Sequence, residues 1–350
     1  MRLEPRATAS PWMTAGAPLL ALAITALVAG AMFAALGKDP LAGLAIFFYE
    51  PIKNVYGLTE LGLKATPLAL CALGLALCYR SNVWNIGADG QLLVGAIAAS
   101  GVALLATPAT GGMLMPVILV AGILGGMFWA ALVAFARDRF NANEILVSLM
   151  LVYVAYYLLA YLVYGPWKDP QGFNFPQTKR FVREALVPII VPGSRLNAGA
   201  ILALLAAVGM AIYMLRTLGG FRLQVGGLAP LAAHYAGFSS RRALWTTLLV
   251  SGGFAGLAGA LEAAGPLGQL TPHVSPGYGF AAIIVAFVGR LHPIGVIAAA
   301  LLMAMLYIGG ELAQSRLGLP KALTGVFQGL LLLALLACDT LVHYRLRWGR

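Results

Sequence analysis

Residues 81–91 read Ser-Asn-Val-Trp-Asn-Ile-Gly-Ala-Asp-Gly-Gln, a polar segment with two glycines between two long apolar runs. Its Asn, Asp and Gln side chains cost free energy close to hydrocarbon unless they are hydrogen-bonded or hydrated. Its glycines allow the backbone to leave a helix at this point. The segment therefore predicts either a loop at a membrane surface or a broken helix that lines a path. Both interpretations favour transport over catalysis.

The composition indicates a membrane protein. Of the 350 residues, 61% are hydrophobic and 10% are charged, whereas a soluble domain carries about 25% charged residues. The formal net charge of +11 comes without a basic stripe interleaved with aromatic residues, so nucleic acid is not expected as a partner. The three cysteines, at positions 71, 78 and 338, lack the spacing of metal ligands, so no metal site is expected. Membrane lipid is the partner that this composition requires.

Apolar runs long enough to cross a bilayer recur along the whole chain. They predict an all-α fold, a polytopic bundle of about ten transmembrane helices, with residues 15–342 as the transmembrane domain. The second and eighth runs are short or interrupted by glycine, which favours broken helices there. The predicted spans are 15–36, 64–80, 91–108, 114–136, 144–165, 197–216, 244–265, 276–290, 293–310 and 322–342.

Basic residues orient these spans, because cytoplasmic segments of membrane proteins are enriched in Lys and Arg. If the N-terminus is cytoplasmic, 13 of the 23 Lys and Arg residues fall in inside segments. An even number of spans then places both tails, residues 1–14 and 343–350, in the cytoplasm. The apolar stretch that follows Arg2 and Arg6 could also be a signal peptide. It is long enough to cross a bilayer and further apolar runs follow, which favours a retained first helix.

Two connections between spans are long. Residues 166–196 form the predicted extracytoplasmic loop, which either caps the entrance of a path or only connects two spans. Residues 217–243 form the predicted cytoplasmic loop, in which two glycine pairs lie between positions 219 and 227. These glycines predict flexible hinges.

A short helix is expected directly after those hinges. Pro230 suits the first turn of a helix, residues 231–236 include good helix formers, and Gly237 can end the helix. A lone helix that exposes Leu and Tyr needs a partner to bury them. The alternative is that this helix lies on its own bundle.

Several catalytic signatures are missing from the sequence. It has no P-loop, no His-Glu-x-x-His and no Gly-x-Ser-x-Gly, so the chain is not expected to bind ATP by a P-loop or to be an enzyme. No catalytic residue is expected. The spacings Gly122-x-x-x-Gly126 and Gly252-x-x-x-Gly256 favour close packing of helices.

Four segments together carry a family resemblance. Residues 85–93, Asn-Ile-Gly-Ala-Asp-Gly-Gln-Leu-Leu, resemble the Asn-Ile-Gly-Ala-Glu-Gly-Gln motif of ABC importer permeases of the simple-sugar and nucleoside branch, which are related to ribose and branched-chain amino-acid permeases. Residues 143–151 resemble the Asn-Glu segment before the fifth span of that branch. Residues 231–237 resemble its Ala-Ala-x-Tyr-Ala-Gly cytoplasmic helix, and residues 277–293 its Gly-Phe…Gly-x-x-x-Pro stretch. The resemblance covers roughly residues 55–340.

Three positions depart from the pattern of that branch. Asp89 stands where Glu is usual, and Ala229 stands where an Asn often precedes the cytoplasmic helix. Val152 stands where Asn is common in the nucleoside branch. These departures weaken the choice of solute more than the choice of family.

The resemblance implies a permease subunit of an ATP-driven importer in the bacterial plasma (inner) membrane. Its partners would be an ATPase subunit, a second permease chain that is a paralogue or a second copy, and an extracytoplasmic solute-binding protein that delivers a nucleoside or a simple sugar. ATP and Mg would bind to the ATPase, and no cofactor to this chain. The contacts with the ATPase would come from the short helix, at Pro230, Ala232, Ala233, His234, Tyr235 and Gly237.

Six polar residues are candidates for lining the translocation path, since sugars and nucleosides carry hydroxyl groups that amides and carboxylates bind. They are Asn82, Asn85, Asp89, Gln91, Asn143 and Glu144. The alternative is that they satisfy the free backbone groups of a broken helix. A secondary transporter or channel would also use broken helices, but it would need no ATPase. A membrane enzyme would need a cluster of acidic and basic residues, which the sequence does not offer.

Overall fold

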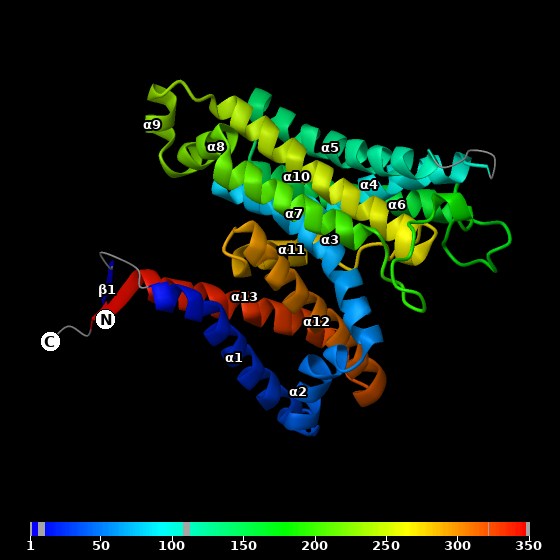
Figure 1. Cartoon of the computed structure of the whole chain (residues 1–350), viewed down its shortest axis with the longest axis horizontal. Coiled ribbons are helices and arrows are strands. Elements are labelled where there is room, and N and C mark those ends of the chain that lie inside the picture. The colour runs from blue at the N-terminus through cyan, green and yellow to red at the C-terminus, as the bar shows by residue number, and fades with distance from the viewer. Residues whose placement is uncertain (1, 6–10, 108–112, 321, 348–350) are drawn as a thin grey trace. The chain divides into compact units, whose positions relative to one another are not determined.

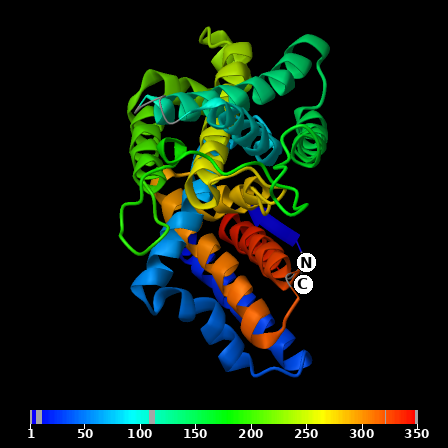
Figure 2. The same ribbon diagram turned by 90° about the vertical axis from the view of Figure 1, so that its right-hand side faces the viewer.

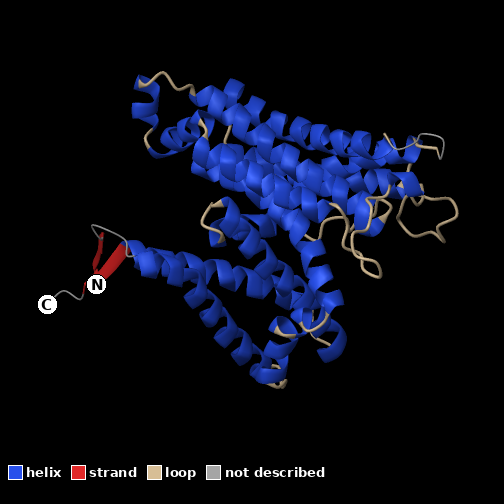
Figure 3. Cartoon of the chain, in the orientation of Figure 1, coloured by secondary structure: helices blue, strands red, loops and turns tan. Residues whose placement is uncertain are grey.

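The computed structural model of the chain describes residues 2–5, 11–107, 113–320 and 322–347. These residues are mostly helical (Figure 3). Nine helices in the described part are long and apolar enough to cross a membrane, and α11 (Tyr278–Val288) is a shorter apolar helix. This confirms the predicted all-α bundle of about ten spans. The chain divides into two compact units, Met1–Leu61 with Leu302–Arg350, and Gly62–Leu301.

The first unit is built from both ends of the chain. An aromatic cluster in its core joins Phe33, Phe47 and Phe327, with ring centroids 5.6 Å apart for Phe33–Phe327 and 5.1 Å for Phe47–Phe327. All three rings are fully buried, so this cluster holds α1, α2 and α13 together. The unit contains α1 (Pro11–Ala35), α2 (Pro40–Phe48), the short 3-10 helix η1 (Glu50–Ile52), the first residues of α3 (Val55–Arg80), the last part of α12 (Pro293–Leu317) and α13 (Ala322–His343).

The two ends of the chain lie side by side. Strand β1 (Arg2–Pro5) pairs antiparallel with β2 (Tyr344–Arg347), so the first and last described residues lie near each other, at the N and C labels of Figure 2. This ladder fits the prediction that both tails lie on one side of the membrane, and their cytoplasmic location stays a prediction. Residues 1, 6–10 and 348–350 of the predicted tails, and residue 108 of the predicted third span, lie outside the described residues.

The second unit is a helical bundle in which α10 (Ser240–Glu262) packs along α5 (Leu114–Phe140) and α4 (Ala88–Leu105) (Figure 1). Helix α10 continues into one π-helical turn, η4 (Ala263–Leu267). The unit also contains α6 (Glu144–Tyr164), the 3-10 helix η3 (Arg183–Ala185), α7 (Gly199–Arg216), α8 (Leu218–Leu228), α9 (Pro230–Tyr235) and α11.

Small residues allow α5 and α10 to cross at close range. A Cβ atom added to Gly126 on α5 would meet the carbonyl oxygen of Gly252 on α10, and one added to Gly256 would meet the carbonyl of Gly122. The two Gly-x-x-x-Gly spacings therefore face each other, which confirms that they serve close helix packing.

The prediction of two broken spans is right for one and wrong for the other. Helix α11 has 11 residues, a length of about 16 Å, which is too short to cross a bilayer. The second span is not short, because α3 runs unbroken for 26 residues with Pro67 inside it. The predicted span began at Lys64 and left out Glu60, whereas α3 includes both residues. In the structure Glu60 is buried and both residues have interaction partners, so the helix continues through them.

Candidate functional site

Residues 81–87 form a break between α3 and α4, as the polar and glycine content predicted. Helix α3 ends in a turn in which the N–H of Val83 donates to the carbonyl of Cys78 at 2.9 Å. Asn82 in this turn has a φ of 54°, a left-handed conformation that Asn tolerates better than most residues. Helix α4 then begins at Ala88. The break places one exposed polar residue, Asn82, and one fully buried one, Asn85, in a single short segment.

The Asn85 amide is fully hydrogen-bonded inside the bundle. Its Nδ2 donates to Gln91 Oε1 and to Ser251 Oγ on α10, both at 3.0 Å. Its Oδ1 accepts from the N–H of Gly87 at 3.0 Å and from Gln91 Nε2 at 3.2 Å. All of these side chains are buried. The network therefore compensates the cost of placing amides in an apolar interior, and it ties the break to α4 and α10.

The Asp89 carboxylate forms a second network around the start of α11. Its Oδ1 accepts from Ser275 Oγ at 2.7 Å and from the N–H of Gly279 at 2.8 Å, and its Oδ2 accepts from the Tyr156 hydroxyl at 2.8 Å. A carboxylate at a helix N-terminus accepts free N–H groups and is favoured by the helix dipole. Asp89 thus links α4 to α6 and α11 while it is itself buried.

Glycine is required where these two helices meet. A Cβ atom on Gly279 would collide with the backbone nitrogen of Asp89. Ser275 completes the contact, since its Oγ accepts from the N–H of Tyr278 at 3.1 Å while it donates to Asp89. The first turn of α11 is therefore held by the neighbouring Ser275 and by Asp89, which lies 190 residues away from Gly279 in the sequence.

Three of the six candidates lie outside both networks. Asn82 is exposed and accepts from Trp84 Nε1 at 3.2 Å. Asn143 caps α6 by accepting from the N–H of Ile145 at 2.9 Å, and Glu144 pairs with Arg137 at 3.2 Å. Asn143 and Glu144 thus belong to the turn between α5 and α6, whereas Asn85 and Gln91 are bonded to each other.

Sequence reasoning missed four residues that complete the networks. Ser251 lies within a predicted span and was not among the candidates, yet it accepts from Asn85. Ser148 Oγ accepts from the N–H of Ile86 at 3.2 Å, and Tyr156 and Ser275 both donate to Asp89. The available signals were isolated Ser residues and one Tyr among several on α6, and none of them by itself identifies a partner.

The predicted short helix is present as α9. Gly237 after it has a φ of 77°, and the N–H of Phe238 donates to the carbonyl of Ala233 at 2.9 Å, a glycine-ended helix cap. Leu231 is 80% exposed and Tyr235 is 92% exposed, whereas Ala233 is buried. The helix therefore does not bury its large apolar side chains on its own bundle.

The predicted flexible hinge before α9 is wrong, because residues 218–228 form helix α8. Thr217 caps its start by accepting from the N–H of Gly220 at 3.2 Å. Low helix propensity of glycine suggested flexibility. In the structure, Gly220 and Gly227 instead allow backbone-to-backbone contact with α7 and α3.

Residues 166–196 form an ordered loop at the opposite end of α10 from α9. The N–H groups of Thr178, Phe181 and Val187 donate to carbonyls of residues 264–270, at 3.1, 2.8 and 2.9 Å. The loop thus adds backbone hydrogen bonds to the segment that follows α10, so it is more than a plain connector.

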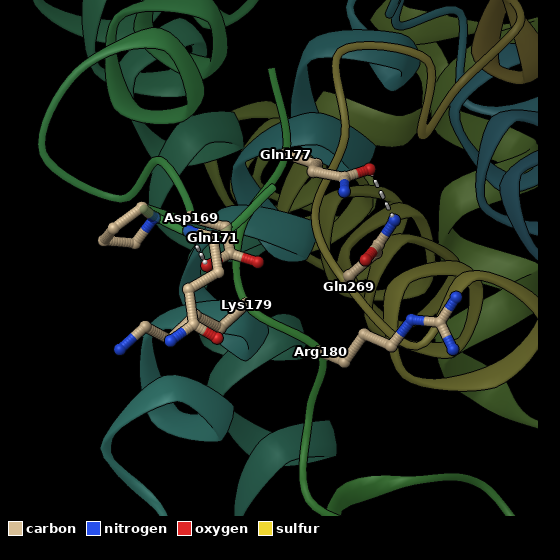
Figure 4. Close-up of a pocket in the computed structure, with 7 residues that line it drawn as sticks. Asp169, Gln171, Gln177, Lys179, Arg180 and Gln269 are labelled. Carbon is tan, nitrogen blue, oxygen red and sulfur yellow. Dashed lines mark hydrogen bonds between the residues drawn. The ribbon is translucent and has the colours of Figure 1, made fainter. Parts of the chain in front are cut away.

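This loop forms most of the wall of an open pocket of about 400 Å³ with polar and charged side chains (Figure 4). Gln269 Nε2 donates to Gln177 Oε1 at 3.1 Å and joins the loop to the end of η4. The lining residues are Asp169, Pro170, Gln171, Gln177, Lys179, Arg180 and Gln269.

A membrane-crossing bundle with a buried polar break, an exposed short helix at one end and an ordered polar loop at the other defines a solute permease. The chain belongs to the family described as the permease component of the branched-chain amino acid transport system, whose model matches residues 57–336.

Similar proteins identify the type of permease, because their names specify ABC transporters. The glucose ABC transporter permease protein of Haloferax volcanii is 36% identical over 99% of this chain and 93% of its own length. A guanosine ABC transporter permease protein of Bacillus subtilis is 31% identical over 90% of this chain and 91% of its own length. A second guanosine ABC transporter permease protein of that organism is 29% identical over 68% of this chain and 76% of its own length. The chain is therefore a transmembrane permease subunit of an ABC importer, which confirms the resemblance to the simple-sugar and nucleoside branch. This family membership implies an ATPase and a solute-binding protein as partners.

Proposed function

We propose that this chain forms the translocation path for a nucleoside or a simple sugar together with a second permease chain, in the plasma (inner) membrane. The solute class is supported by relatives whose names specify glucose and guanosine. The observation that carries the proposal is α9, whose exposed Leu231 and Tyr235 lie on a chain without a P-loop. A permease subunit of an ABC importer without a P-loop takes its free energy from a separate ATPase, and α9 is a surface through which that ATPase can act.

The ATPase docks on α9 in this proposal. Leu231, His234 and Tyr235 are exposed and offer apolar and polar contacts, and buried aromatic side chains dominate the energy of many interfaces. ATP and Mg²⁺ bind to the ATPase, which hydrolyses ATP, and this chain contributes no cofactor site.

The second permease is a paralogous chain. This is supported by the two guanosine permease proteins of Bacillus subtilis, both of which are similar to this chain. A second copy of this chain is the other arrangement compatible with the proposal.

The solute-binding protein docks on the loop 166–196. This loop carries five basic and two acidic residues, so it favours an acidic partner surface. Exposed Lys179 and Arg180 also line the pocket, which offers a recess for an acidic side chain of the partner.

Asn85, Asp89 and Gln91 shape the path rather than bind solute in the conformation described. Their side chains are fully buried and bonded to other protein groups, so they hold the broken backbone. Solute selectivity then rests mainly with the binding protein.

Reconstitution in liposomes tests this function. The chain is combined with its ATPase, a paralogous permease and the binding protein, and uptake of radiolabelled guanosine and glucose is measured with and without ATP. We expect uptake that requires both ATP and the binding protein. Uptake driven by an ion gradient without the ATPase would instead identify a secondary transporter or channel.

A further inference from the structure

The last turn of α8 rests directly on the end of α3. A Cβ atom on Gly227 would meet the carbonyl of Arg80 and the backbone of Ser81. A Cβ atom on the neighbouring Gly226 would meet nothing within 4 Å. Of two adjacent glycines, one is therefore a contact point and the other is not.

The first turn of α8 is held just as closely by α7. A Cβ atom on Gly220 would meet the backbone of Tyr213 and Met214, and Leu223 between the two contact glycines is buried. Close-packed contacts of this kind have little compressibility and transmit displacement. Helix α8 therefore makes close backbone contacts at both ends, with α7 at its first turn and with α3 at its last turn.

Only one residue, Ala229, separates α8 from α9. The N–H of Ala229 donates to the carbonyl of Val225 at 2.9 Å, and the N–H of Ala233 donates to the carbonyl of Ala229 at 2.9 Å. The same residue therefore ends one hydrogen-bonded turn and starts the next. With a single residue between the helices, no loop is available to absorb a displacement of α9 before it reaches the last turn of α8.

The end of α3 is in turn tied to the buried amide network. The Tyr79 hydroxyl donates to the carbonyl of Asn85 at 3.0 Å, and Ser81 Oγ donates to the carbonyl of Leu77 at 2.9 Å. The contact of Gly227 with Arg80 is therefore next to the residue that holds Asn85. A continuous series of contacts therefore leads from α9 through α8 to the end of α3, and from there through the Tyr79 hydroxyl to the break between α3 and α4.

We propose that α8 is a strut that passes displacement of α9 to the break at residues 81–87, and that Gly227 is the positioning residue at its contact with α3. This inference rests on the proposed docking of the ATPase on α9. A side chain at position 227 would separate α8 from the Arg80 carbonyl, so movement of α9 would no longer reach Asn85.

Two alanine variants on adjacent positions test the strut. Gly227→Ala adds a methyl group at the contact, and Gly226→Ala adds the same group, with the same change in helix propensity, in open space. Each variant is reconstituted with the ATPase, the second permease and the binding protein, and solute taken up per ATP hydrolysed is measured. We expect Gly227→Ala to lower this ratio on the order of fivefold or more, with ATPase copurification retained, and Gly226→Ala to leave it unchanged.

A cysteine introduced in the break at residues 81–87 shows whether movement of α9 reaches the break or whether the variant only perturbs the local structure of α8. Asn82 is exposed and all three native cysteines are buried, so Asn82→Cys provides one accessible thiol for maleimide labelling. Its labelling rate should depend on nucleotide in the Gly226→Ala background and lose this dependence in the Gly227→Ala background. If Gly227→Ala does not accumulate in the membrane, Leu223→Ala loosens the same helix without added bulk and should lower the ratio in the same direction.

An unchanged ratio and unchanged nucleotide-dependent labelling in Gly227→Ala, or in Leu223→Ala where that variant replaces it, would overturn the proposal. Loss of ATPase copurification in Gly227→Ala would also overturn it, because Gly227 would then act in docking. If no ATPase copurifies with the unmodified chain, the proposed function fails, and that outcome is distinct from failure of the strut.

Discussion

The Asp89 carboxylate on α4 accepts a hydrogen bond from the backbone N–H of Gly279 on α11 at 2.8 Å. One side chain near the start of a spanning helix therefore caps a helix that is too short to span. The Ser275 and Tyr156 hydroxyls share the same carboxylate, so a buried charge is compensated by three donors and by a helix dipole. This arrangement makes Asp89 a structural anchor for α11.

Removal of that carboxylate should destabilise the protein. Asp89→Ala leaves the Gly279 N–H and two hydroxyls without their acceptor, which should lower the free energy of unfolding by ~2–4 kcal/mol. Asp89→Asn retains one carbonyl oxygen and should cost about half as much. Tyr156→Phe, which removes a single donor, should cost ~1 kcal/mol. Denaturant titration of the purified chain in detergent measures all three. Equal stability of Asp89→Ala and the unmodified chain would contradict the anchor role.

The buried amides should behave as one unit. Asn85 and Gln91 exchange two hydrogen bonds, so the effects of Asn85→Ala and Gln91→Ala on the free energy of unfolding should not add. A double-mutant cycle should give an interaction of ~1–2 kcal/mol. Asn82→Ala, on the exposed side of the same break, is the control and should lie within about 0.5 kcal/mol of the unmodified chain. Strict additivity of the Asn85 and Gln91 variants would mean that the network is not cooperative.

The glycine-lined crossing between α5 and α10 should not tolerate a methyl group. Gly126→Ala would place Cβ against the Gly252 carbonyl and should destabilise the protein by ~1–3 kcal/mol. Gly209 on α7 has nothing within 4 Å of an added Cβ, so Gly209→Ala should be neutral or stabilising by a few tenths of a kcal/mol, since Ala is the better helix former. The comparison of unfolding midpoints in detergent tests the crossing. Similar midpoints for the two variants would show that the helices can separate at little cost.

Local patterns predicted much of this fold. Hydropathy located the spans, the Gly-x-x-x-Gly spacings identified the crossing of α5 and α10, and Pro230 with Gly237 bounded α9. The networks could not be predicted in the same way, because they are long-range. Ser275 lies 186 residues from Asp89, and Ser251 lies 166 residues from Asn85, so a single sequence contains no spacing that connects them.

Two predictions, the hinge before α9 and the short second span, were wrong for the same reason. Both were based on local sequence alone, without the tertiary contacts that these residues make. Glycine-rich residues 218–228 suggested a hinge, yet Gly227 serves contact with Arg80 and helix α8 forms. The second span was predicted to be short and to begin at residue 64, yet α3 begins at Val55 and includes Glu60, which has an interaction partner. In each case tertiary contact overrides local propensity.

Exposed side chains of α9 should control ATPase binding without affecting stability. Tyr235→Ala and Leu231→Ala remove apolar area that is 92% and 80% exposed in the chain alone, so each should weaken ATPase copurification by about tenfold and leave the unfolding midpoint unchanged. Tyr157→Ala, at a side chain 75% exposed on α6, is the matched control. Ala233→Arg is less informative, because Ala233 is buried and a guanidinium there would displace α9 itself. Full copurification of the Tyr235→Ala, Leu231→Ala double variant would place the ATPase elsewhere.

Charge reversal in the loop 166–196 should weaken binding of the solute-binding protein. Lys179 and Arg180 line the pocket, whereas Arg183 is exposed on the same loop outside it. Lys179→Glu with Arg180→Glu should reduce affinity for the binding protein on the order of tenfold or more at low ionic strength, and the difference should shrink as salt screens exposed charges. Arg183→Glu should have a smaller effect, because its charge lies outside the recess. Surface plasmon resonance with the reconstituted complex at two salt concentrations measures both. If Arg183→Glu weakens binding as much as the pocket pair, the loop acts through its overall charge and the recess has no specific role.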